Sequence, residues 1–282
     1  MTKEKILITG ANGQLGQALA ALYPDAECVD RDTFDIGDPA IFLARDWRQY
    51  SMIVNAAAYT AVDAAETTDG RLEAWQANAV APANLSLVAT QNNLTLVHIS
   101  SDYVFDGTED DHTETEPFSP LGVYGQTKAA GDIAVALAPR HYVIRTSWVI
   151  GKGNNFVRMM KSLADKGVKP SVVNDQIGRL TFTEDLAGAI KHLTDTSAAY
   201  GTYNVSNSGD PASWSDIAKL VYEHAGHAAD EVTGITTAQY YEGKDGIAPR
   251  PLRSSLDLSK LLATGFTPRD WREALSEYIN QE

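Results

Sequence analysis

Short apolar segments rich in β-branched residues recur along the chain, and each is followed by a longer stretch with apolar residues at helical spacing. The apolar segments cover residues 5–9, 27–30, 52–56, 96–100 and 142–150. This alternation predicts strands and helices in turn. Hydrophobicity within each strand is continuous, which indicates that helices cover both faces of a parallel sheet. The predicted fold class is α/β with a doubly wound parallel sheet, and ligand sites are expected at the carboxyl ends of its strands.

The pattern becomes less regular after Ile150. Helices are predicted over residues 156–166, 184–196, 213–225 and 270–279, with one further strand over 203–206. We expect residues 1–150 and 181–207 to form the domain that contains the sheet. Residues 151–180 and 208–282 are expected to form a smaller C-terminal lobe, which leaves room for a second ligand-binding unit.

The composition indicates a folded protein with a strongly acidic charge. Of the 282 residues, 44% are hydrophobic and 21% are charged, and 37 acidic against 23 basic side chains give a net charge of -14. These values exclude disordered and collagen-like classes. The negative field disfavours nucleic acid and anionic membrane surfaces as partners. Any anionic ligand therefore requires a locally basic site.

Nothing in the sequence marks secretion or a membrane span. The beginning of the chain lacks the pattern of a signal peptide, and no apolar segment reaches the ~18 residues needed to cross a bilayer. The single cysteine, Cys28, is expected to be a small buried residue. These features predict a cytoplasmic protein in a reducing compartment.

A glycine-rich turn follows the first predicted strand. It reads Gly10-Ala-Asn-Gly13-Gln-Leu-Gly16, with glycines three residues apart where a helix begins. Gly10 permits the tight turn, Gly13 lets the backbone approach a pyrophosphate, and Gly16 allows close packing of the helix on the strand. The free N–H groups at the start of the helix favour a phosphate there. The order of strand, turn and helix favours a Rossmann-like dinucleotide site over an ordinary glycine-rich turn.

Candidates for the rest of the dinucleotide site follow the next two strands. Asp30 lies about 20 residues after Gly10, where a carboxylate can accept hydrogen bonds from an adenosine ribose and favours NADH. Arg31 is either a partner for the 2′-phosphate of NADPH or a solvated surface charge. Asp35 and Ile36 are candidates for the edge of the adenine ring. Small side chains that suit either cofactor contact or helix packing end the third strand, and the candidates there are Ala56, Ala57, Ala58, Tyr59 and Thr60.

Three residues are candidates for catalysis. Tyr124-Gly-Gln-Thr-Lys128 opens a predicted helix, and a spacing of four places Tyr124 and Lys128 on one helix face. The ammonium group is expected to lower the pKa of the phenol, so that Tyr124 exchanges a proton with a developing alkoxide near neutral pH. Ser101 ends the fourth strand close to the start of that helix, and its hydroxyl can polarise a carbonyl oxygen. The set suits reduction of a ketone.

In this order, the glycine turn, the serine and the Tyr/Lys pair resemble the extended branch of the short-chain dehydrogenase/reductase superfamily. Longer stretches are similar to the signatures of the dTDP-4-dehydrorhamnose reductase family. These stretches span nearly the whole chain, at residues 54–63, 101–107, 123–128, 145–148, 153–156 and 175–178. The resemblance implies reduction of the C4 ketone of dTDP-4-dehydro-L-rhamnose by NADPH or NADH, which gives dTDP-L-rhamnose for cell-surface polysaccharide.

The resemblance also implies roles for individual residues. Tyr124 would donate the proton, Lys128 would support it and bind the nicotinamide ribose, and Ser101 would polarise the carbonyl. Asp102 and Trp148 would lie against the sugar, although a core position is an equal alternative for a large aromatic residue such as Trp148. Dinucleotide contacts are implied for Gly13, Gln14, Leu15, Asp30, Asp35, Ile36, Ala58, Tyr59 and Thr60.

The pyrophosphate of a dTDP-sugar needs positive charge, and four basic residues are our candidates for binding it. They are Arg250 and Arg253 in a C-terminal loop, together with Lys152 or Arg158. Solvated surface positions are the alternative for each of them.

Two positions depart from the family pattern. Leu180 stands where the family usually carries proline. The resemblance therefore does not fix the backbone conformation after this residue or the details of substrate binding. Some relatives form dimers through a metal ion bound by a glutamate of the first helix, whereas residues 17–22 contain no carboxylate. We therefore expect no required metal and a monomer or weak homodimer.

Two further features are expected to be structural. The six acidic residues within 106–116 lack the regular spacing of a calcium-binding loop, so they are expected to form a solvated loop. His98 lies on an otherwise apolar strand and is expected to be a core residue with satisfied hydrogen bonds.

Two other functions stay open. A sugar-nucleotide dehydratase or epimerase would use the same scaffold, but a dehydratase typically carries two consecutive carboxylates after the catalytic hydroxyl, and here Tyr103 follows Asp102. A non-catalytic regulatory subunit that binds a dinucleotide is the alternative from another class. Such a subunit has no need of a complete Ser/Tyr/Lys set.

Overall fold

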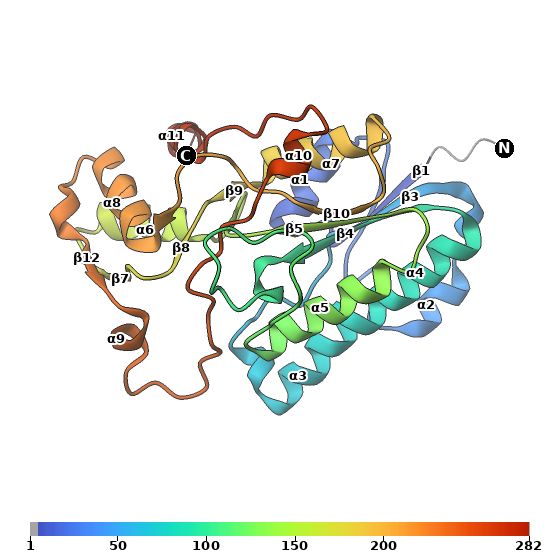
Figure 1. The fold of residues 1–282 in the computed structure, drawn as a ribbon, viewed down its shortest axis with the longest axis horizontal. Coiled ribbons are helices and arrows are strands. Elements are labelled where there is room, and N and C mark those ends of the chain that lie inside the picture. Colours follow the sequence, from blue (N-terminus) through green and yellow to red (C-terminus); the bar gives the residue numbers. More distant parts are fainter. Residues whose placement is uncertain (1–4, 282) are drawn as a thin grey trace.

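The computed structural model describes residues 5–281, and a six-stranded sheet lies at its centre (Figure 1). Its strand order is β10-β5-β4-β3-β1-β2, and every pair is parallel. The strands are β1 (Lys5–Thr9), β2 (Glu27–Val29), β3 (Tyr50–Asn55), β4 (Thr95–Ser101), β5 (His141–Thr146) and β10 (Gly201–Asn204). The order reverses between β1 and β3, so a ligand crevice is expected beyond their carboxyl ends. The predicted doubly wound, Rossmann-like sheet is confirmed.

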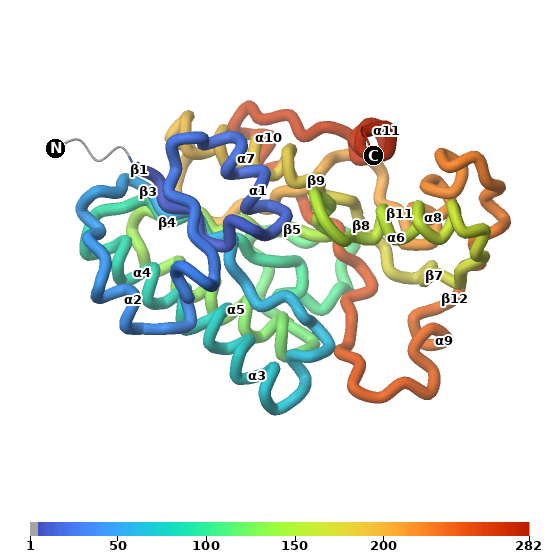
Figure 2. Tube along the Cα trace, turned by 180° about the vertical axis from the view of Figure 1, so that it is seen from behind, coloured from blue at the N-terminus to red at the C-terminus, as the bar shows by residue number. Residues whose placement is uncertain are grey.

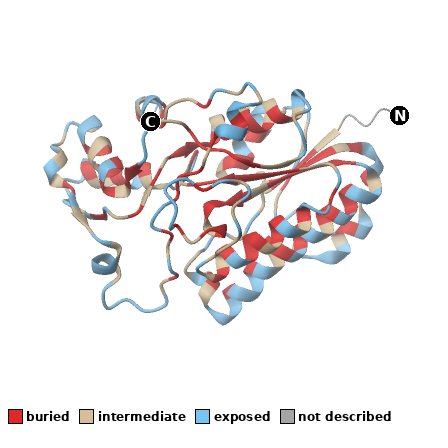
Figure 3. Cartoon of the chain, viewed as in Figure 1, coloured by how far each residue is buried: buried red, intermediate tan, exposed pale blue. Residues whose placement is uncertain are grey.

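Helices cover both faces of this sheet. One face carries α1 (Gln14–Leu22), α7 (Thr183–Asp195) and α10 (Ser259–Leu262), and the other carries α2 (Pro39–Ala44), α3 (Thr68–Trp75), α4 (Ala81–Asn92) and α5 (Val123–Val135). Neighbouring residues of one strand belong to hydrophobic clusters on opposite faces of the sheet. Leu7 packs in one cluster and Ile8 in the other. The strands are therefore buried while the outer helix faces are exposed (Figure 3). This two-sided burial explains the continuous hydrophobicity of the strand sequences.

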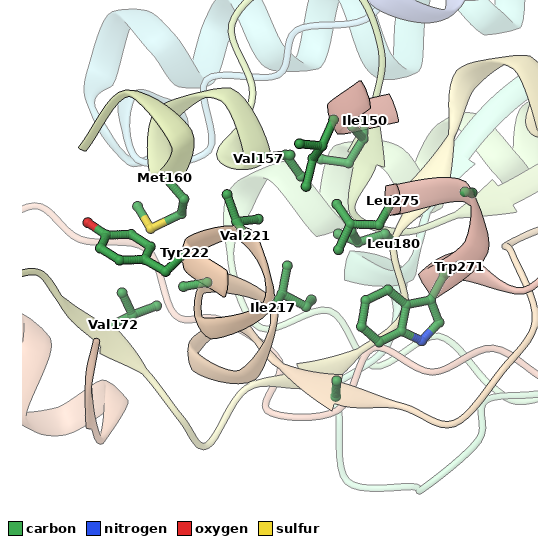
Figure 4. Packing of buried hydrophobic residues seen from close by; sticks show 14 of the residues in the cluster. Ile150, Val157, Met160, Val172, Leu180, Ile217, Val221, Tyr222, Trp271 and Leu275 are labelled. Carbon is green, nitrogen blue, oxygen red and sulfur yellow. The ribbon is translucent and has the colours of Figure 1, made fainter. Parts of the chain in front are cut away.

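A separate hydrophobic cluster joins elements that lie to one side of the sheet in both the front and back views (Figures 1 and 2). It joins α6 (Phe156–Asp165), α8 (Trp214–His224) and α11 (Trp271–Asn280). The shorter elements of this region are β6 (Val149–Ile150), β7 (Ser171–Val173), β8 (Ile177–Gly178), β9 (Thr181–Phe182), β11 (Ala212–Ser213), β12 (Thr233–Ile235) and α9 (Thr237–Tyr241). Leu180 is fully buried there, in the same cluster as Trp271 and Leu275 (Figure 4). Leu180 thus contributes to the core.

Two predictions about local structure are wrong. The strand predicted over 142–150 breaks at Trp148, whose φ of 45° is left-handed, and β6 then pairs with β9 outside the main sheet. Cys28 is exposed, because it lies on β2, the edge strand that only β1 pairs with.

The acidic segment over residues 106–116 is only partly solvated. Glu109, Asp110 and Asp111 are exposed, but Glu114 and Glu116 are partly buried. The Glu114 carboxylate accepts a hydrogen bond from the backbone N–H of Asn204 at 3.0 Å, and the Glu116 carboxylate is 2.9 Å from the buried His112 ring. Glu114 therefore binds the segment to the edge strand β10, and Glu116 binds a ring within the segment itself, which composition alone does not reveal.

Candidate functional site

A crevice opens where β1 and β3 end, and the glycine turn lies at its base. Gly10 has a φ of +69°, and a Cβ at this position would lie 2.6 Å from the backbone N of Ala57. The N–H of Ala56 donates to the carbonyl of Thr9 at 3.2 Å, which holds the two strand ends together. Only glycine combines this backbone conformation with so close an approach.

The other two glycines of the turn bring the helix onto it. A Cβ on Gly16 would lie 2.1 Å from the carbonyl oxygen of Gly10, and the N–H of Gly13 donates to the same oxygen at 3.0 Å. Gly13 is the N-cap of α1 and provides no side-chain cap. The first N–H groups of α1 thus remain available to an anion such as a pyrophosphate.

A cavity of about 250 Å³ adjoins this turn and joins most of the predicted dinucleotide residues. Asp30 in its wall binds the Asn12 amide and accepts a hydrogen bond from the Thr33 hydroxyl, while Arg31 is mostly exposed. The predicted residues in the wall are Gly10, Asp30, Arg31, Asp35, Ile36, Ala57, Ala58 and Tyr59. Residues that sequence reasoning missed are Phe34, Gly37, Glu73, Gln76 and Ala77. The lining of polar and small apolar groups fits an adenosine moiety.

Seven predicted cofactor residues lie outside this cavity, and three of them are Gly13 and Gly16 of the glycine turn and Lys128 of α5. The Gln14 side chain accepts a hydrogen bond from the Gly151 N–H at 2.8 Å and lines a different cavity of about 520 Å³. Leu15 is buried in the core, Ala56 packs against that core, and Thr60 is exposed. For Gln14 and Leu15, the backbone at the start of α1 is the part that can contact a dinucleotide.

The catalytic candidates meet at the carboxyl end of β4. Ser101 ends this strand, and its hydroxyl interacts with the Tyr124 phenol and donates a hydrogen bond to Asp102 at 2.9 Å. The Tyr103 ring packs edge-on against Tyr124, with 5.3 Å between ring centroids. Gly125 permits this closeness, since a Cβ there would lie 2.1 Å from the Tyr103 carbonyl oxygen. The structure therefore places two hydroxyls beside a buried carboxyl group.

The expected lowering of the Tyr124 pKa is contradicted. Burial, followed by the charge of Asp102, raises the pKa of Tyr124 above its ordinary value. The Lys128 ammonium donates to the Ile99 carbonyl at 2.6 Å and is directed toward β4. Burial lowers the pKa of Lys128 to about 8. Tyr124 is thus protonated at neutral pH, which suits a proton donor.

Asn78 and Glu66 position this site, and neither was found from the sequence. Asn78 is fully buried in a π-helix over Gln76–Val80, where its side chain bonds both the N–H and the carbonyl of Tyr59, at 2.9 and 3.0 Å. The Glu66 carboxylate accepts a hydrogen bond from the Val123 N–H at 2.8 Å and so caps α5. The hydrophobic pattern contains no signal for a π-helix or for a cap donated from a distant segment.

The predicted sugar and pyrophosphate residues do not form one group. Trp148 stacks on Trp214 with 3.8 Å between ring centroids, which connects the link between β5 and β6 to the start of α8. Arg250 pairs with Asp63 at 2.8 Å, and its charge acts on Tyr103 next to Tyr124. Arg253 pairs with the exposed Asp110. Lys152 and Arg158 instead line the cavity of about 520 Å³ between α1, α7 and α11.

Replacing Asp102 with asparagine is expected to stabilise the protein at neutral pH. Burial raises the pKa of Asp102 from 3.8 to about 6, against hydrogen bonds from Ser254 and Ser101. With a raised folded pKa, the carboxyl group stabilises the fold below pH ~4 and loses that contribution as pH rises through ~6. The variant should gain about 2–3 kcal/mol at pH 8 relative to pH 4. Urea unfolding at both pH values measures this, and an equal change at both would contradict it.

The structure of residues 5–281 contains neither a membrane-spanning helix nor a cluster of metal ligands. No helix there is long and apolar enough to cross a membrane. Likewise, that range holds no group of three or more His, Cys, Asp or Glu side chains that could bind a metal ion.

Comparison with known proteins adds an independent finding. Residues 4–282 match the family model described as the RmlD substrate binding domain. The dTDP-4-dehydrorhamnose reductase of Aggregatibacter actinomycetemcomitans is 37% identical, over 96% of this chain and 97% of that protein. The enzyme of the same name from Mycobacterium tuberculosis is 35% identical, over 97% and 91%. The solved structure of Bacillus anthracis dTDP-4-dehydrorhamnose reductase in complex with NADP is 34% identical, with a TM-score of 0.90 and full coverage of both chains. The chain therefore belongs to the dTDP-4-dehydrorhamnose reductase family.

Proposed function

We propose that this protein reduces the C4 ketone of dTDP-4-dehydro-L-rhamnose to give dTDP-L-rhamnose, in the synthesis of nucleotide sugars for cell-surface polysaccharide. The observation that carries this proposal is the pair of Ser101 and Tyr124 hydroxyls at the carboxyl end of β4. Ser101 ends β4, the strand next to β3, whose end forms the nucleotide crevice, and Tyr124 lies in the first turn of α5. The names of full-length relatives support the substrate.

Each catalytic residue has a role that its surroundings support. A protonated Tyr124 donates its proton to the oxygen that forms at C4, and the Ser101 hydroxyl steadies the same oxygen. Lys128 holds positive charge behind the phenol and binds the ribose of the nicotinamide. Oδ2 of Asp102 is buried and has no hydrogen-bond partner in the described structure, so a sugar hydroxyl that enters this site would satisfy it.

The crevice fits NADPH or NADH. The uncapped start of α1 and the glycine turn suit a pyrophosphate, and the cavity of about 250 Å³ suits the adenosine. Asp30 suits a ribose hydroxyl, and the exposed Arg31 suits a 2′-phosphate. When bound, the reduced nicotinamide supplies the hydride.

A direct assay tests the function. Purified protein is mixed with dTDP-4-dehydro-L-rhamnose and either NADPH or NADH, and loss of the reduced-nicotinamide absorbance is followed together with product identification. Oxidation of the cofactor with formation of dTDP-L-rhamnose is expected. Water elimination without cofactor oxidation would favour a dehydratase, and binding without any reaction would favour a regulatory subunit.

Replacing Arg250 with glutamine should raise the KM for the sugar nucleotide by roughly 10-fold or more, because a charge-assisted hydrogen bond to phosphate contributes about 1.5–3 kcal/mol. The guanidinium is mostly buried and lies near Tyr103, so it can reach a substrate beside Tyr124. NADPH affinity should not change. Arg48→Gln is the matched control, because Arg48 also pairs with an aspartate but is highly exposed. An unchanged KM in the Arg250 variant would remove this residue from the substrate site.

Three expectations stay predictions. We propose that residues 1–150 and 181–207 bind the dinucleotide and that residues 151–180 and 208–282 bind the sugar nucleotide, a division supported by the separate hydrophobic cluster of α6, α8 and α11. We also keep the expectations of a monomer or weak homodimer and of a cytoplasmic location.

A further inference from the structure

A third polar residue continues the face of α5 that carries Tyr124 and Lys128. Asp132 follows Lys128 by four residues, as Lys128 follows Tyr124, and a helix places residues at this spacing one above another. Lys128 is 1% exposed and Asp132 is 3% exposed. Two opposite charges thus lie one turn apart in a region that excludes water.

Asp132 is held by a second buried ion pair. Arg145 on β5 is 3% exposed, and its Nε is 3.0 Å from Oδ2 of Asp132. The guanidinium carbon lies 5.2 Å from the ring centre of Phe105 and 4.9 Å from that of Phe118, and Nη1 donates to the Glu114 carbonyl at 3.1 Å. These contacts restrict the position and orientation of the guanidinium group. Arg145 therefore fixes where the Asp132 charge lies.

The other titratable groups around Lys128 do not replace this charge. His98 on β4 is fully buried, and burial, followed by the charge of Lys128, lowers its pKa well below the ordinary value, so it is neutral. Tyr124 is protonated, Asp102 faces Tyr124, and Glu66 caps the start of the helix. Burial raises the pKa of Asp132, and the charge of Arg145, the Ser100 hydroxyl and the charge of Lys128 oppose that rise and favour the carboxylate.

We propose that Asp132, oriented by Arg145, is a positioning residue that keeps the Lys128 ammonium charged and in place behind Tyr124. The inference rests on the reductase function proposed above and adds residues that act through Lys128. Burial lowers the pKa of Lys128 to about 8, and the negative charge of Asp132 is the influence that raises it against burial. Without that charge, Lys128 would lose its proton at a lower pH.

Asp132→Asn tests this through pH dependence. In the wild type, kcat should fall as pH rises past about 8, where Lys128 loses its proton. In the variant, this fall should move to lower pH by roughly 1–2 units, the effect of losing a buried opposite charge one helix turn away. The affinity for NADPH, measured by fluorescence titration, should show the same displacement because Lys128 is the proposed ribose ligand. Asp132→Glu restores the charge and should restore most of the profile.

A surface pair provides the matched control. Lys191 and Asp195 on α7 have the same four-residue spacing but are partly exposed to solvent, so Asp195→Asn should leave both profiles unchanged. Asp132→Asn leaves Arg145 buried without its partner, and the variant can fail to fold for that reason. The double variant Asp132→Asn with Arg145→Gln removes both charges. It should recover thermal stability while its pH profiles stay displaced.

Two results would overturn the inference. If the stable double variant has wild-type pH profiles, Asp132 has only a structural role. If Asp132→Asn lowers kcat equally at every pH, it does not act through the charge of Lys128. Absence of sugar reduction in the wild type would instead refute the proposed function, and the NADPH titration would still decide the role of Asp132.

Discussion

Replacing Tyr124 with phenylalanine should lower kcat for reduction of the keto-sugar by about 10²–10⁴-fold, the usual contribution of a positioned proton donor. The change removes one hydroxyl and leaves the ring, so the packing against Tyr103 at 5.3 Å is preserved. Since the dinucleotide crevice lies at β1 and β3, NADPH affinity should stay within a few-fold of the wild type. Steady-state kinetics and fluorescence titration of NADPH measure the two effects separately.

Tyr103→Phe is the matched control for this experiment. It makes the same chemical change on the neighbouring ring, whose hydroxyl has no proposed part in the reaction, and kcat should change little. If Tyr124→Phe retained most of its turnover, another group would have to donate the proton. If neither variant nor wild type turned over the sugar, a regulatory subunit would explain the chain better.

Replacing Gly16 with alanine should abolish tight NADPH binding. The added Cβ would lie 2.1 Å from the Gly10 carbonyl oxygen and 2.7 Å from the Ala11 Cα. Both atoms belong to the backbone of the turn, which therefore has to move away from α1. Overpacking of this kind costs typically ~1–3 kcal/mol, and more where rigid backbone is displaced. We expect a lower thermal midpoint and loss of NADPH binding by roughly 100-fold or more, since ~3 kcal/mol corresponds to about that factor.

Gly188→Ala in α7 is the control. A Cβ there meets no atom within 4 Å, so alanine should stabilise the helix by about 0.5–1 kcal/mol and leave NADPH binding unchanged. Differential scanning calorimetry and fluorescence titration compare the two variants. Normal NADPH affinity in Gly16→Ala would mean that the turn can shift without losing its fit to the pyrophosphate.

Local patterns in the sequence predicted most strands of the main sheet and the helices next to the candidate site correctly. The strands at 5–9 and 96–100, the glycine turn and the helix that begins near Tyr124 all lie where the pattern placed them. These features depend on residues within one or two turns of each other. The pattern also separated the irregular region after Ile150, although it missed the break at Trp148 because a left-handed tryptophan has no sequence signature.

Local sequence patterns do not predict contacts between segments that are far apart along the chain. Asp63 neutralises Arg250 from 187 positions away, and Glu66 caps a helix that begins 57 positions later. The pKa of Tyr124 was expected to fall because Lys128 is four residues away, yet burial raises it and the ammonium is directed to the Ile99 carbonyl. The spacing of residues along a helix shows which side chains share a face. The loss of water around those side chains depends on every segment that packs against that face.

The sequence by itself determined the doubly wound sheet, because continuous apolar strands alternate with helical periods. It also named the glycine-rich turn and Ser101, Tyr124 and Lys128 as candidates, because few residue types suit those roles, and these assignments stay predictions. Only the tertiary structure decided which charges are paired, which carboxyl groups are buried and which oxygens lack partners, as it did for Asp102, Asp132 and Arg250. The physical reason is that electrostatic free energies depend on three-dimensional distance and on exclusion of water.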